Sequence, residues 1–169
     1  AFIGLDSNLG DRRGYIEKAV EELKRSGAVE VMKVSSLYET EPVGGPPQGK
    51  YLDGVAEIRT MLAPRTLMAL LKEIEKKVGR TPSDVRWGPR EIDLDILLFD
   101  DIIIDEPDLK IPHPLLHLRD FMLEPICEIA PDAVHPVLKK SVADILSDLT
   151  QSPSPLPSPQ RGEDIKKIR

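Results

Sequence analysis

The sequence predicts an α+β sandwich, in which helices cover a mainly antiparallel β-sheet. Strand-like and helix-like segments follow one another as β-α-β-β-α-β-β-α-α, without the regular alternation of a doubly wound fold. The second and third strands are joined by a Pro- and Gly-rich loop at 41–50, which suits an antiparallel pair rather than a parallel crossover. With 169 residues, the chain is long enough for one domain with a sizeable core.

The first half of the chain is predicted to hold three strands and two helices. Apolar residues recur every three or four positions in the helices, and Pro64 and Gly79 are suited to the start and the end of the second one. In chain order we expect a strand over 2–6, a helix over 12–25, strands over 29–40 and 51–61, and a helix over 64–78.

The second half begins with an apolar run over 92–99, which we interpret as a central strand that is covered on both faces. A turn and a short strand over 102–104 follow. Two helices are then expected, over 119–129 and over 141–149, the second capped by Ser141.

The C-terminal segment has a different composition from the rest. Residues 151–169 are rich in Ser and Pro, and a basic end over 166–169 follows. Such a segment buries little apolar surface, so we expect a disordered tail that includes the basic end. The folded domain is accordingly predicted to span residues 1–150.

Composition limits the classes of function. A net charge of −6 disfavours bulk electrostatic binding to nucleic acid or to an anionic membrane. The single cysteine, Cys127, excludes an internal disulfide and a cysteine-based zinc site. With neither a signal-peptide pattern nor a long apolar run, we expect a cytoplasmic monomer that binds small molecules.

Two carboxylates stand out in the 92–99 strand. Side chains two apart on a strand share a face, which places Asp93 and Asp95 side by side, with Cα atoms about 6.6 Å apart. Two neighbouring carboxylates raise each other's pKa unless a cation neutralises them. Carboxylate oxygens suit Mg²⁺, which also takes water and phosphate ligands. The alternative is that this pair merely solvates the end of a strand.

Cations and an aromatic ring directly precede this pair. Arg86 and Arg90 could bind phosphates, and Trp87 could stack on a planar group, although each of these residues alone is more often structural. Together with the two carboxylates they indicate a nucleotide site. Because the chain has no Walker loop and no G-x-G-x-x-G pattern, side chains and metal would have to hold the phosphates.

At this point the sequence resembles the 6-hydroxymethyl-7,8-dihydropterin pyrophosphokinases of folate biosynthesis. The resemblance covers nearly everything before the tail and is carried by Ser7-Asn8-Leu9-Gly10, Tyr38-Glu39-Thr40-Glu41-Pro42-Val43-Gly44, Arg86-Trp87-Gly88-Pro89-Arg90, Ile92-Asp93-Leu94-Asp95-Ile96 and Ile111-Pro112-His113-Pro114. It implies a ferredoxin-like α+β sandwich. It also implies transfer of pyrophosphate from ATP to the pterin hydroxymethyl group, with AMP as the other product.

The resemblance also implies roles for individual residues. Asp93 and Asp95 would hold two Mg²⁺ ions, and with Arg80 and Arg90 they would be the catalytic residues. The expected ATP contacts are Glu75, Arg80, Trp87, Arg90, Ile96, Lys110, His113 and Arg119. The expected pterin contacts are Thr40, Val43, Tyr51, Asp53, Trp87 and Phe121, with the two aromatic rings of Tyr51 and Phe121 on either side of the pterin.

Three positions depart from the family pattern. Asp6 stands where glycine is usual, Pro82 where a second loop arginine is common, and Asp53 where an asparagine usually reads the pterin amide edge. We expect Asp53 to lie near a solvent-facing loop and to be ionised at neutral pH. As an acceptor-only group it would make the pterin shift, and Asp53→Asn would then tighten pterin binding by about 1 kcal/mol.

Two other functions remain open on the sequence alone. These departures would also fit a catalytically inactive descendant that binds a nucleotide or a pterin. A two-metal nuclease or hydrolase is the more remote possibility. In the leading interpretation, the loops over 41–50 and 80–89 flank the site and close over bound ATP.

Overall fold

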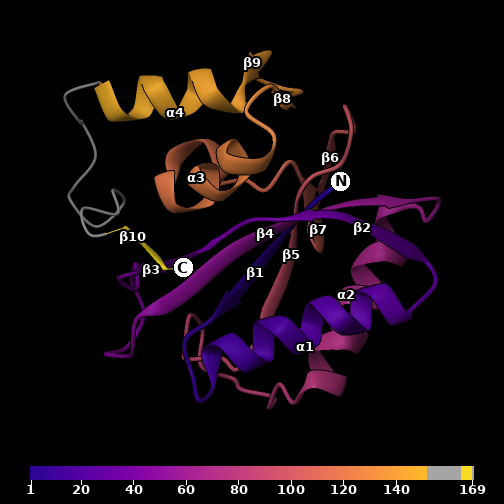
Figure 1. Cartoon of the computed structure of the whole chain (residues 1–169), viewed down its shortest axis with the longest axis vertical. Helices are drawn as coiled ribbons and strands as arrows, with labels where there is room; N and C mark the ends of the chain where they lie inside the picture. The colour runs from indigo at the N-terminus through magenta and orange to yellow at the C-terminus, as the bar shows by residue number, and fades with distance from the viewer. Residues whose placement is uncertain (152–164, 169) are drawn as a thin grey trace.

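The computed structural model describes residues 1–151 and 165–168, and a six-stranded antiparallel sheet lies at its centre (Figure 1). Five of the strands lie in the order β10-β3-β4-β1-β5. The sixth, β2, pairs with β4 on the same side as β3, but nearer the C-terminal end of β4. Their bounds are β1 (Phe2–Ser7), β2 (Val29–Val34), β3 (Leu37–Thr40), β4 (Tyr51–Thr60), β5 (Asp93–Leu98) and β10 (Lys166–Ile168). This antiparallel sheet confirms the predicted fold class.

Helices lie on both sides of the sheet. In Figure 1, α1 (Arg12–Arg25) and α2 (Pro64–Val78) lie below it, and α3 (Asp120–Ile129) and α4 (Val142–Gln151) lie above it. Both α1 and α2 pack on one face of the sheet, and on the other face α3 packs on the sheet while α4 packs on α3. All four helices fall close to the predicted ranges. Within residues 1–151 and 165–168, no helix is long and apolar enough to cross a membrane.

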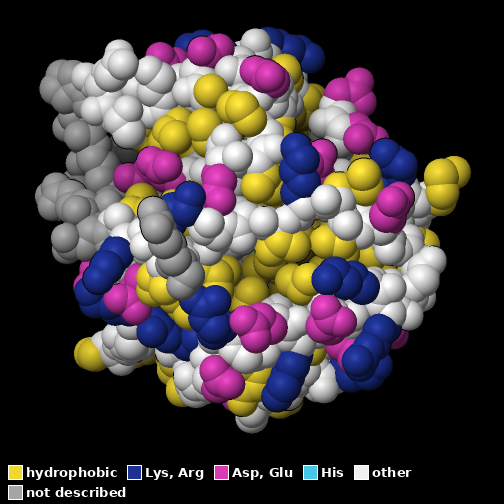
Figure 2. All heavy atoms as spheres, in the orientation of Figure 1, with side chains coloured by type: hydrophobic (Ala, Val, Ile, Leu, Met, Phe, Trp, Pro, Cys, Tyr) yellow, Lys and Arg dark blue, Asp and Glu magenta, His cyan; other side chains and the backbone are white. Residues whose placement is uncertain are grey.

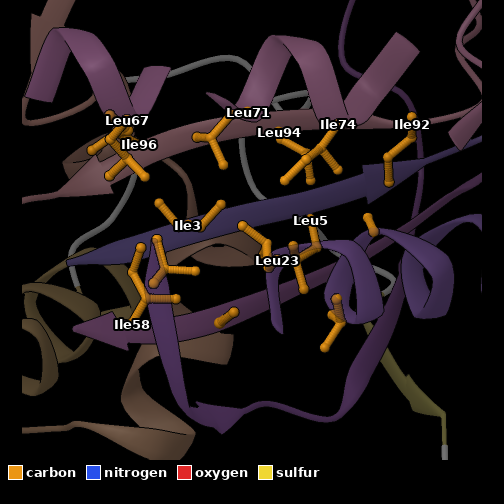
Figure 3. Close-up of a cluster of buried hydrophobic side chains, with 14 of the residues drawn as sticks. Ile3, Leu5, Leu23, Ile58, Leu67, Leu71, Ile74, Ile92, Leu94 and Ile96 are labelled. Carbon is orange, nitrogen blue, oxygen red and sulfur yellow. The ribbon is translucent and has the colours of Figure 1, made fainter. Parts of the chain in front are cut away.

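The sheet separates two hydrophobic cores, because alternate side chains of a strand point to opposite faces. The larger core joins α1 and α2 to the sheet (Figure 3). From β1 it takes Ile3 and Leu5, and from β5 it takes Leu94 and Ile96. The smaller core packs α3 and α4 against the other face and includes Leu97.

The helix ends agree with the sequence signals. Gly79 closes α2 at a φ of 119°, a left-handed conformation that glycine adopts without a steric penalty. Its backbone N–H donates to the carbonyl oxygens of Glu75 and Lys76 at 3.2 Å. At the start of α4, the Ser141 hydroxyl accepts the Asp144 N–H at 3.1 Å, as predicted.

The predicted strand over 29–40 is two strands, β2 and β3, and Ser35 explains the interruption. Its backbone N–H donates to the Val55 carbonyl at 2.9 Å, as in an ordinary ladder. The Val55 N–H, however, donates to the Ser35 hydroxyl, also at 2.9 Å. A side chain therefore replaces the backbone acceptor at this point, and the regular pairing stops.

The short strand predicted over 102–104 is wrong in its range. The turn after β5 includes an Ile102 N–H bond to the Phe99 carbonyl at 3.0 Å, so pairing starts only at Ile104. A hairpin follows, made by β6 (Ile104–Glu106) and β7 (Leu109–Ile111). Three further short elements carry too few residues for a periodic signal: η1 (Leu116–Leu118), β8 (Val134–His135) and β9 (Lys140–Ser141).

The expectation of a mobile basic end is wrong for residues 166–168. They form β10, which pairs antiparallel with β3, and Ile168 packs against the larger core. Lys167 also lies 3.5 Å from the Glu128 carboxylate on α3. The rest of the predicted tail, 152–164 and 169, lies outside the described residues.

Charged side chains of both signs share the surface that faces the viewer in Figure 2. Lys and Arg are interspersed with Asp and Glu there, and hydrophobic side chains show between them. Among the described residues on this face, neither sign forms a continuous field.

Candidate active site

Asp93 and Asp95 lie on the face of β5 that is directed toward α3. Their neighbours Leu94 and Ile96 point into the larger core, and Leu97 points into the smaller one. The prediction that the two carboxylates share a face is therefore confirmed. The prediction of a central strand is wrong, because β5 ends the strand order of the sheet, although both of its faces are covered.

Basic side chains converge on Asp93. Arg80 donates to one of its carboxylate oxygens at 2.7 Å, and Arg90 donates to the other at 2.9 Å. The ammonium group of Lys72 lies 3.7 Å from Asp93 and also 3.7 Å from Asp95. Burial opposes ionisation of Asp93, but these cations outweigh it and lower the pKa of Asp93 below its usual value.

Asp95 has a different environment, although it is only two residues away. Burial, followed by the nearby charge of Asp93, raises the pKa of Asp95 to about 6. Among residues 1–151 and 165–168, only Lys72 lies within ion-pair distance of it. Asp95 is therefore the carboxylate that would gain most from an added cation.

Glu75 on α2 organises the cations around this dyad. Its buried carboxylate accepts from Arg80 at 2.6 Å, from Lys72 at 2.8 Å and from the Leu94 N–H at 2.7 Å. It therefore ties α2 to β5 and orients both basic side chains. Sequence reasoning does not single out Lys72, and the signal that could have found it is its spacing of three residues from Glu75 on one helix face.

The dyad opens into a cavity of about 390 Å³ between the end of the sheet and the start of α3. Eleven of the predicted site residues line it: Thr40, Val43, Tyr51, Asp53, Trp87, Arg90, Asp93, Asp95, His113, Arg119 and Phe121. The cavity thus brings together residues from both the expected ATP contacts and the expected pterin contacts.

Four predicted residues do not line this cavity. Arg80 binds Asp93 and Glu75 binds Arg80, but neither Arg80 nor Glu75 lines the cavity. The Ile96 side chain is buried in the larger core, so any contact with a ligand here would have to come from its backbone. Lys110 lies on β7 and forms an ion pair with Asp105.

Two acidic residues and a hydroxyl form one end of the cavity. Asp6 on β1 and Asp53 on β4 are direct cross-strand partners, and the Thr40 hydroxyl donates to Asp53. Asp53 is 5% exposed, so the expectation that it lies beside a solvent-facing loop is wrong. The expectation failed because position 53 is the third residue of β4, where it pairs with Asp6 on β1 and with Tyr38 on β3.

Burial changes the ionisation of both acids. It raises the pKa of Asp53 to about 7, although hydrogen bonds from Thr40 and Asp6 oppose the shift. It raises the pKa of Asp6 well above its usual value, and the charges of Asp53, Asp93 and Asp95 add to the effect. Full ionisation of Asp53 at neutral pH, as expected from the sequence, is therefore wrong.

Aromatic side chains line the walls of the same cavity. Tyr51 comes from the first residue of β4, and Phe121 comes from the first turn of α3. The Arg119 guanidinium lies 5.5 Å from the centre of the Phe121 ring. Trp87 is half-exposed, and the Arg86 guanidinium lies 4.8 Å from its ring.

The two loops predicted to flank the site are in contact. Gln48 donates to the Trp87 carbonyl at 2.9 Å and accepts from Asn8 at 2.8 Å. The Asn8 side chain in turn accepts the Arg90 N–H at 2.8 Å. Asn8 therefore joins the end of β1 to both loops, a bridging role that the sequence does not reveal.

His113 lies on the side of the cavity nearest α3. Burial, followed by the charge of Arg119, lowers the pKa of His113 to about 4, so the ring is neutral near pH 7. Its Nδ1 accepts the Leu115 N–H at 3.2 Å. The proton of the neutral ring therefore sits on Nε2, which makes this nitrogen a hydrogen-bond donor.

Comparisons with known proteins agree with the features described above. Residues 2–131 match the family model of 7,8-dihydro-6-hydroxymethylpterin-pyrophosphokinase (HPPK). The chain is 42% identical to 2-amino-4-hydroxy-6-hydroxymethyldihydropteridine pyrophosphokinase of Aquifex aeolicus over 152 residues, which cover 90% of this chain and 93% of that protein. It is 49% identical to the Bacillus subtilis protein of the same name over 129 residues, which cover 76% and 77% of the two chains.

Solved structures support the same fold. Wild-type HPPK-DHPS of Plasmodium falciparum superposes on 88% of this chain with a TM-score of 0.68 and 14% sequence identity. The matched region is 44% of the length of that longer protein. On the strength of the family model and the two bacterial relatives, the chain belongs to the 7,8-dihydro-6-hydroxymethylpterin-pyrophosphokinase family.

Proposed function

We propose that this protein transfers a pyrophosphoryl group from ATP to the hydroxymethyl oxygen of 6-hydroxymethyl-7,8-dihydropterin, a step of folate biosynthesis. The observation that carries the proposal is the shared cavity. The Asp93–Asp95 dyad and the aromatic walls formed by Tyr51 and Phe121 line the same space. A polyphosphate held at the dyad would therefore lie next to a flat ring held between the aromatic side chains.

The donor set fits Mg²⁺, which prefers oxygen ligands and usually takes one or two carboxylates together with water and phosphate oxygens. Across residues 1–151 and 165–168, no group of three or more His, Cys, Asp or Glu side chains is arranged to hold a metal by itself. Asp93 and Asp95 would therefore hold two Mg²⁺ ions jointly with the phosphates of ATP. Bound there, Mg²⁺ would neutralise the charge of the polyphosphate during transfer.

The cations around the dyad are suited to the same polyphosphate. Arg80 and Arg90 are held in place by Asp93, and each can turn a guanidinium N–H toward a phosphate oxygen. Arg119 and neutral His113 line the same cavity and add donors. Lys110, Glu75 and Ile96 remain predicted ATP contacts, at positions outside the cavity lining.

The other end of the cavity suits the pterin. Tyr51 and Phe121 offer aromatic faces, and Trp87 and Val43 extend the apolar wall. Thr40 and Asp53 supply polar groups for the edge of the ring. A slot of this kind fixes a planar heterocycle in one orientation, with its hydroxymethyl arm toward the dyad.

The chemistry then needs positioning and charge neutralisation more than covalent help. The substrate oxygen forms a bond to the β-phosphorus, and the bond between that phosphorus and the oxygen of the α-phosphate breaks. AMP leaves with the bridging oxygen, and the hydroxyl proton is released. Arg80 and Arg90 would stabilise the negative charge that is redistributed among the phosphate oxygens.

The test is an assay for AMP release with ATP, Mg²⁺ and the hydroxymethyl dihydropterin, with Asp95→Asn as the inactive control. We expect AMP formation that depends on both the pterin and the metal. Binding of both substrates without AMP formation would instead identify the protein as an inactive descendant. The intact dyad favours the enzyme, and the cytoplasmic location and monomeric state stay predictions.

A further inference from the structure

Lys72 on α2 reaches both carboxylates of the dyad from the edge of the sheet. The helix packs on the larger-core face, whereas Asp93 and Asp95 project from the other face of β5. Because β5 ends the strand order, the Lys72 side chain can pass around it, and its ammonium donates to the Leu94 carbonyl at 2.9 Å. Lys72 does not line the cavity, so the side of the dyad that faces the cavity stays open to a ligand.

Lys72 is the basic side chain that the two carboxylates share. Its ammonium lies 3.7 Å from an oxygen of Asp93 and 3.7 Å from an oxygen of Asp95. Arg80 and Arg90 form their ion pairs with Asp93, so Lys72 is the cation that bridges the dyad. A metal ion held by both carboxylates would lie close to this ammonium and would be repelled by it.

The ion pairs around the dyad are balanced in charge. One network of contacts joins three carboxylates and three cations: Glu75, Asp93 and Asp95 with Lys72, Arg80 and Arg90. Mg²⁺ alone would add two positive charges to this neutral and partly buried network, and an uncompensated charge is costly there. ATP brings negative phosphates with the metal. The network therefore favours the metal together with the nucleotide over the metal alone.

Lys72 can leave the dyad without disrupting the rest of the network. Its side chain is partly exposed and has a flexible four-carbon stem. Glu75 holds the ammonium at 2.8 Å, and it keeps hydrogen bonds from Arg80 and from the Leu94 N–H after the ammonium turns away. The released ammonium is a point charge with three N–H donors, which suits a phosphate oxygen.

We propose that Lys72 is a positioning residue whose ammonium holds Asp93 and Asp95 until ATP binds and then moves to the phosphates, so that metal and nucleotide bind cooperatively. This inference rests on the proposed function, because it takes the dyad as the site of both metal and ATP phosphates. By linkage, the factor by which ATP strengthens metal binding equals the factor by which the metal strengthens ATP binding. Lys72 sets part of that factor.

The experiment measures metal binding and nucleotide binding separately, with the full chain at one fixed pH. Mn²⁺ is the metal probe, because it accepts the same oxygen ligands as Mg²⁺ and its unbound form is measured by electron paramagnetic resonance. Lys72→Met removes the charge and keeps an unbranched side chain. We expect Lys72→Met to bind Mn²⁺ without nucleotide about tenfold more tightly, a typical size for coupling between two sites.

The affinity for nucleotide should change in the opposite direction. With saturating Mg²⁺, Lys72→Met should bind a non-hydrolysable ATP analogue about tenfold more weakly, because the ammonium that moves to the phosphates is missing. With a chelator in place of Mg²⁺ the change should be less than about threefold, because the ammonium of the unsubstituted protein then stays with the dyad. A purely structural role would weaken all three binding reactions together.

Three further variants separate charge from structure. Lys72→Arg keeps the positive charge and should behave like the unsubstituted protein in all three measurements. The matched control is Lys76→Met, an exposed lysine one turn farther along α2, which is expected to change nothing. If Lys72→Met lowers the thermal midpoint, Lys72→Gln gives the same comparison and keeps an N–H donor for the Leu94 carbonyl.

Two results would overturn the proposal: Mn²⁺ binding without nucleotide that is equal in Lys72→Met and the unsubstituted protein, or the same changes in Lys72→Arg as in Lys72→Met. Normal AMP formation by the unsubstituted protein together with either result would refute the role of Lys72 and leave the proposed function standing. An unsubstituted protein that neither binds the ATP analogue nor forms AMP would refute both.

Discussion

Arg80 and Asp93 form a 2.7 Å ion pair that joins the loop after α2 to the face of β5 that carries the proposed metal ligands. The guanidinium nitrogen that makes this bond also donates to Glu75 at 2.6 Å. Arg80 is therefore held beside the proposed phosphate site but is not part of the cavity lining. Binding of a polyphosphate at Asp93 would give this guanidinium a new anionic partner.

Arg80→Ala is expected to slow the chemical step more than it weakens ATP binding, because the new contact forms as charge develops on the phosphates. Single-turnover measurements should show a loss of about a hundredfold in rate, the scale of a lost transition-state donor. The affinity for an ATP analogue should change much less. Equal losses in rate and affinity would reduce Arg80 to a ground-state contact.

Asp95→Asn is expected to abolish turnover and to leave the thermal midpoint unchanged or higher. Its carboxyl is partly buried beside Asp93, which raises the pKa of Asp95, so a neutral amide relieves repulsion in the metal-free protein. The measurements are AMP release at saturating Mg²⁺ and a melting curve without metal. Activity above a few per cent would contradict the assignment of Asp95 as a metal ligand.

Asp93→Ala should abolish turnover too, but with a loss of stability. Asp93 accepts from Arg80 and Arg90, and its removal leaves two partly buried cations without that partner. We expect a loss of about 2 kcal/mol in the free energy of unfolding, measured in urea, the scale of hydrogen bonds to a charged group. A stability equal to that of Asp95→Asn would refute this difference.

The raised pKa of Asp53 predicts a pH dependence of stability. The pKa of Asp53 is about 7 in the folded chain and 3.8 ordinarily. Between these two pH values the folded chain therefore binds more protons than the unfolded chain. The contribution of Asp53 to the free energy of unfolding is therefore greatest below pH 4. It is lost as the pH rises to 7, by at most about 1.4 kcal/mol per pH unit. The difference in unfolding free energy between Asp53→Asn and the unsubstituted protein should follow this slope. A difference that is flat from pH 5 to pH 7 would contradict the raised pKa.

Loss of β10 is expected to destabilise the fold, in contrast to the sequence-based expectation that the tail contributes nothing. Ile168 packs against the larger core, so Ile168→Asp should lower the thermal midpoint by several degrees. Removal of residues 165–169 should have a similar effect. The matched control is Lys166→Asp, at an exposed position of the same strand. Equal midpoints for all four proteins would show that β10 contributes no stability.

Local patterns predicted the parts of the fold that depend on local periodicity. The alternation around Leu94 and Ile96 was enough to place Asp93 and Asp95 on one face, because strand geometry fixes that relation. The same alternation could not reveal that β5 is an edge strand. Apolar residues on both faces of a strand indicate that both faces are covered, but they do not indicate how many strands pair with it. The pairing of β10 with β3 escaped prediction for a related reason: a three-residue strand has almost no signal of its own.

The site was predictable where its chemistry is carried by residues close together in sequence. Arg86, Trp87, Arg90 and the dyad lie within ten residues of one another. Their closeness in space could therefore be predicted from their closeness in the sequence. The environment of Asp53 did not, because its burial depends on β1 and on Thr40, which are distant in the chain. Lys72 was missed because only the fold brings α2 against β5.

The pairing of β10 with β3 has a consequence for how copies of this protein behave toward one another. An unpaired outer strand offers N–H and carbonyl groups to any other chain and so promotes self-association. At one end of the sheet, β10 occupies the outer ladder of β3. At the other end, the His113 N–H donates to the Leu97 carbonyl at 3.0 Å and occupies part of the outer side of β5. β10 is itself an edge strand, but it has only three residues and carries Lys166 and Lys167, and short, charged edge strands discourage pairing with another chain. Its removal would instead expose the outer side of β3, the strand that contributes Thr40 to the cavity.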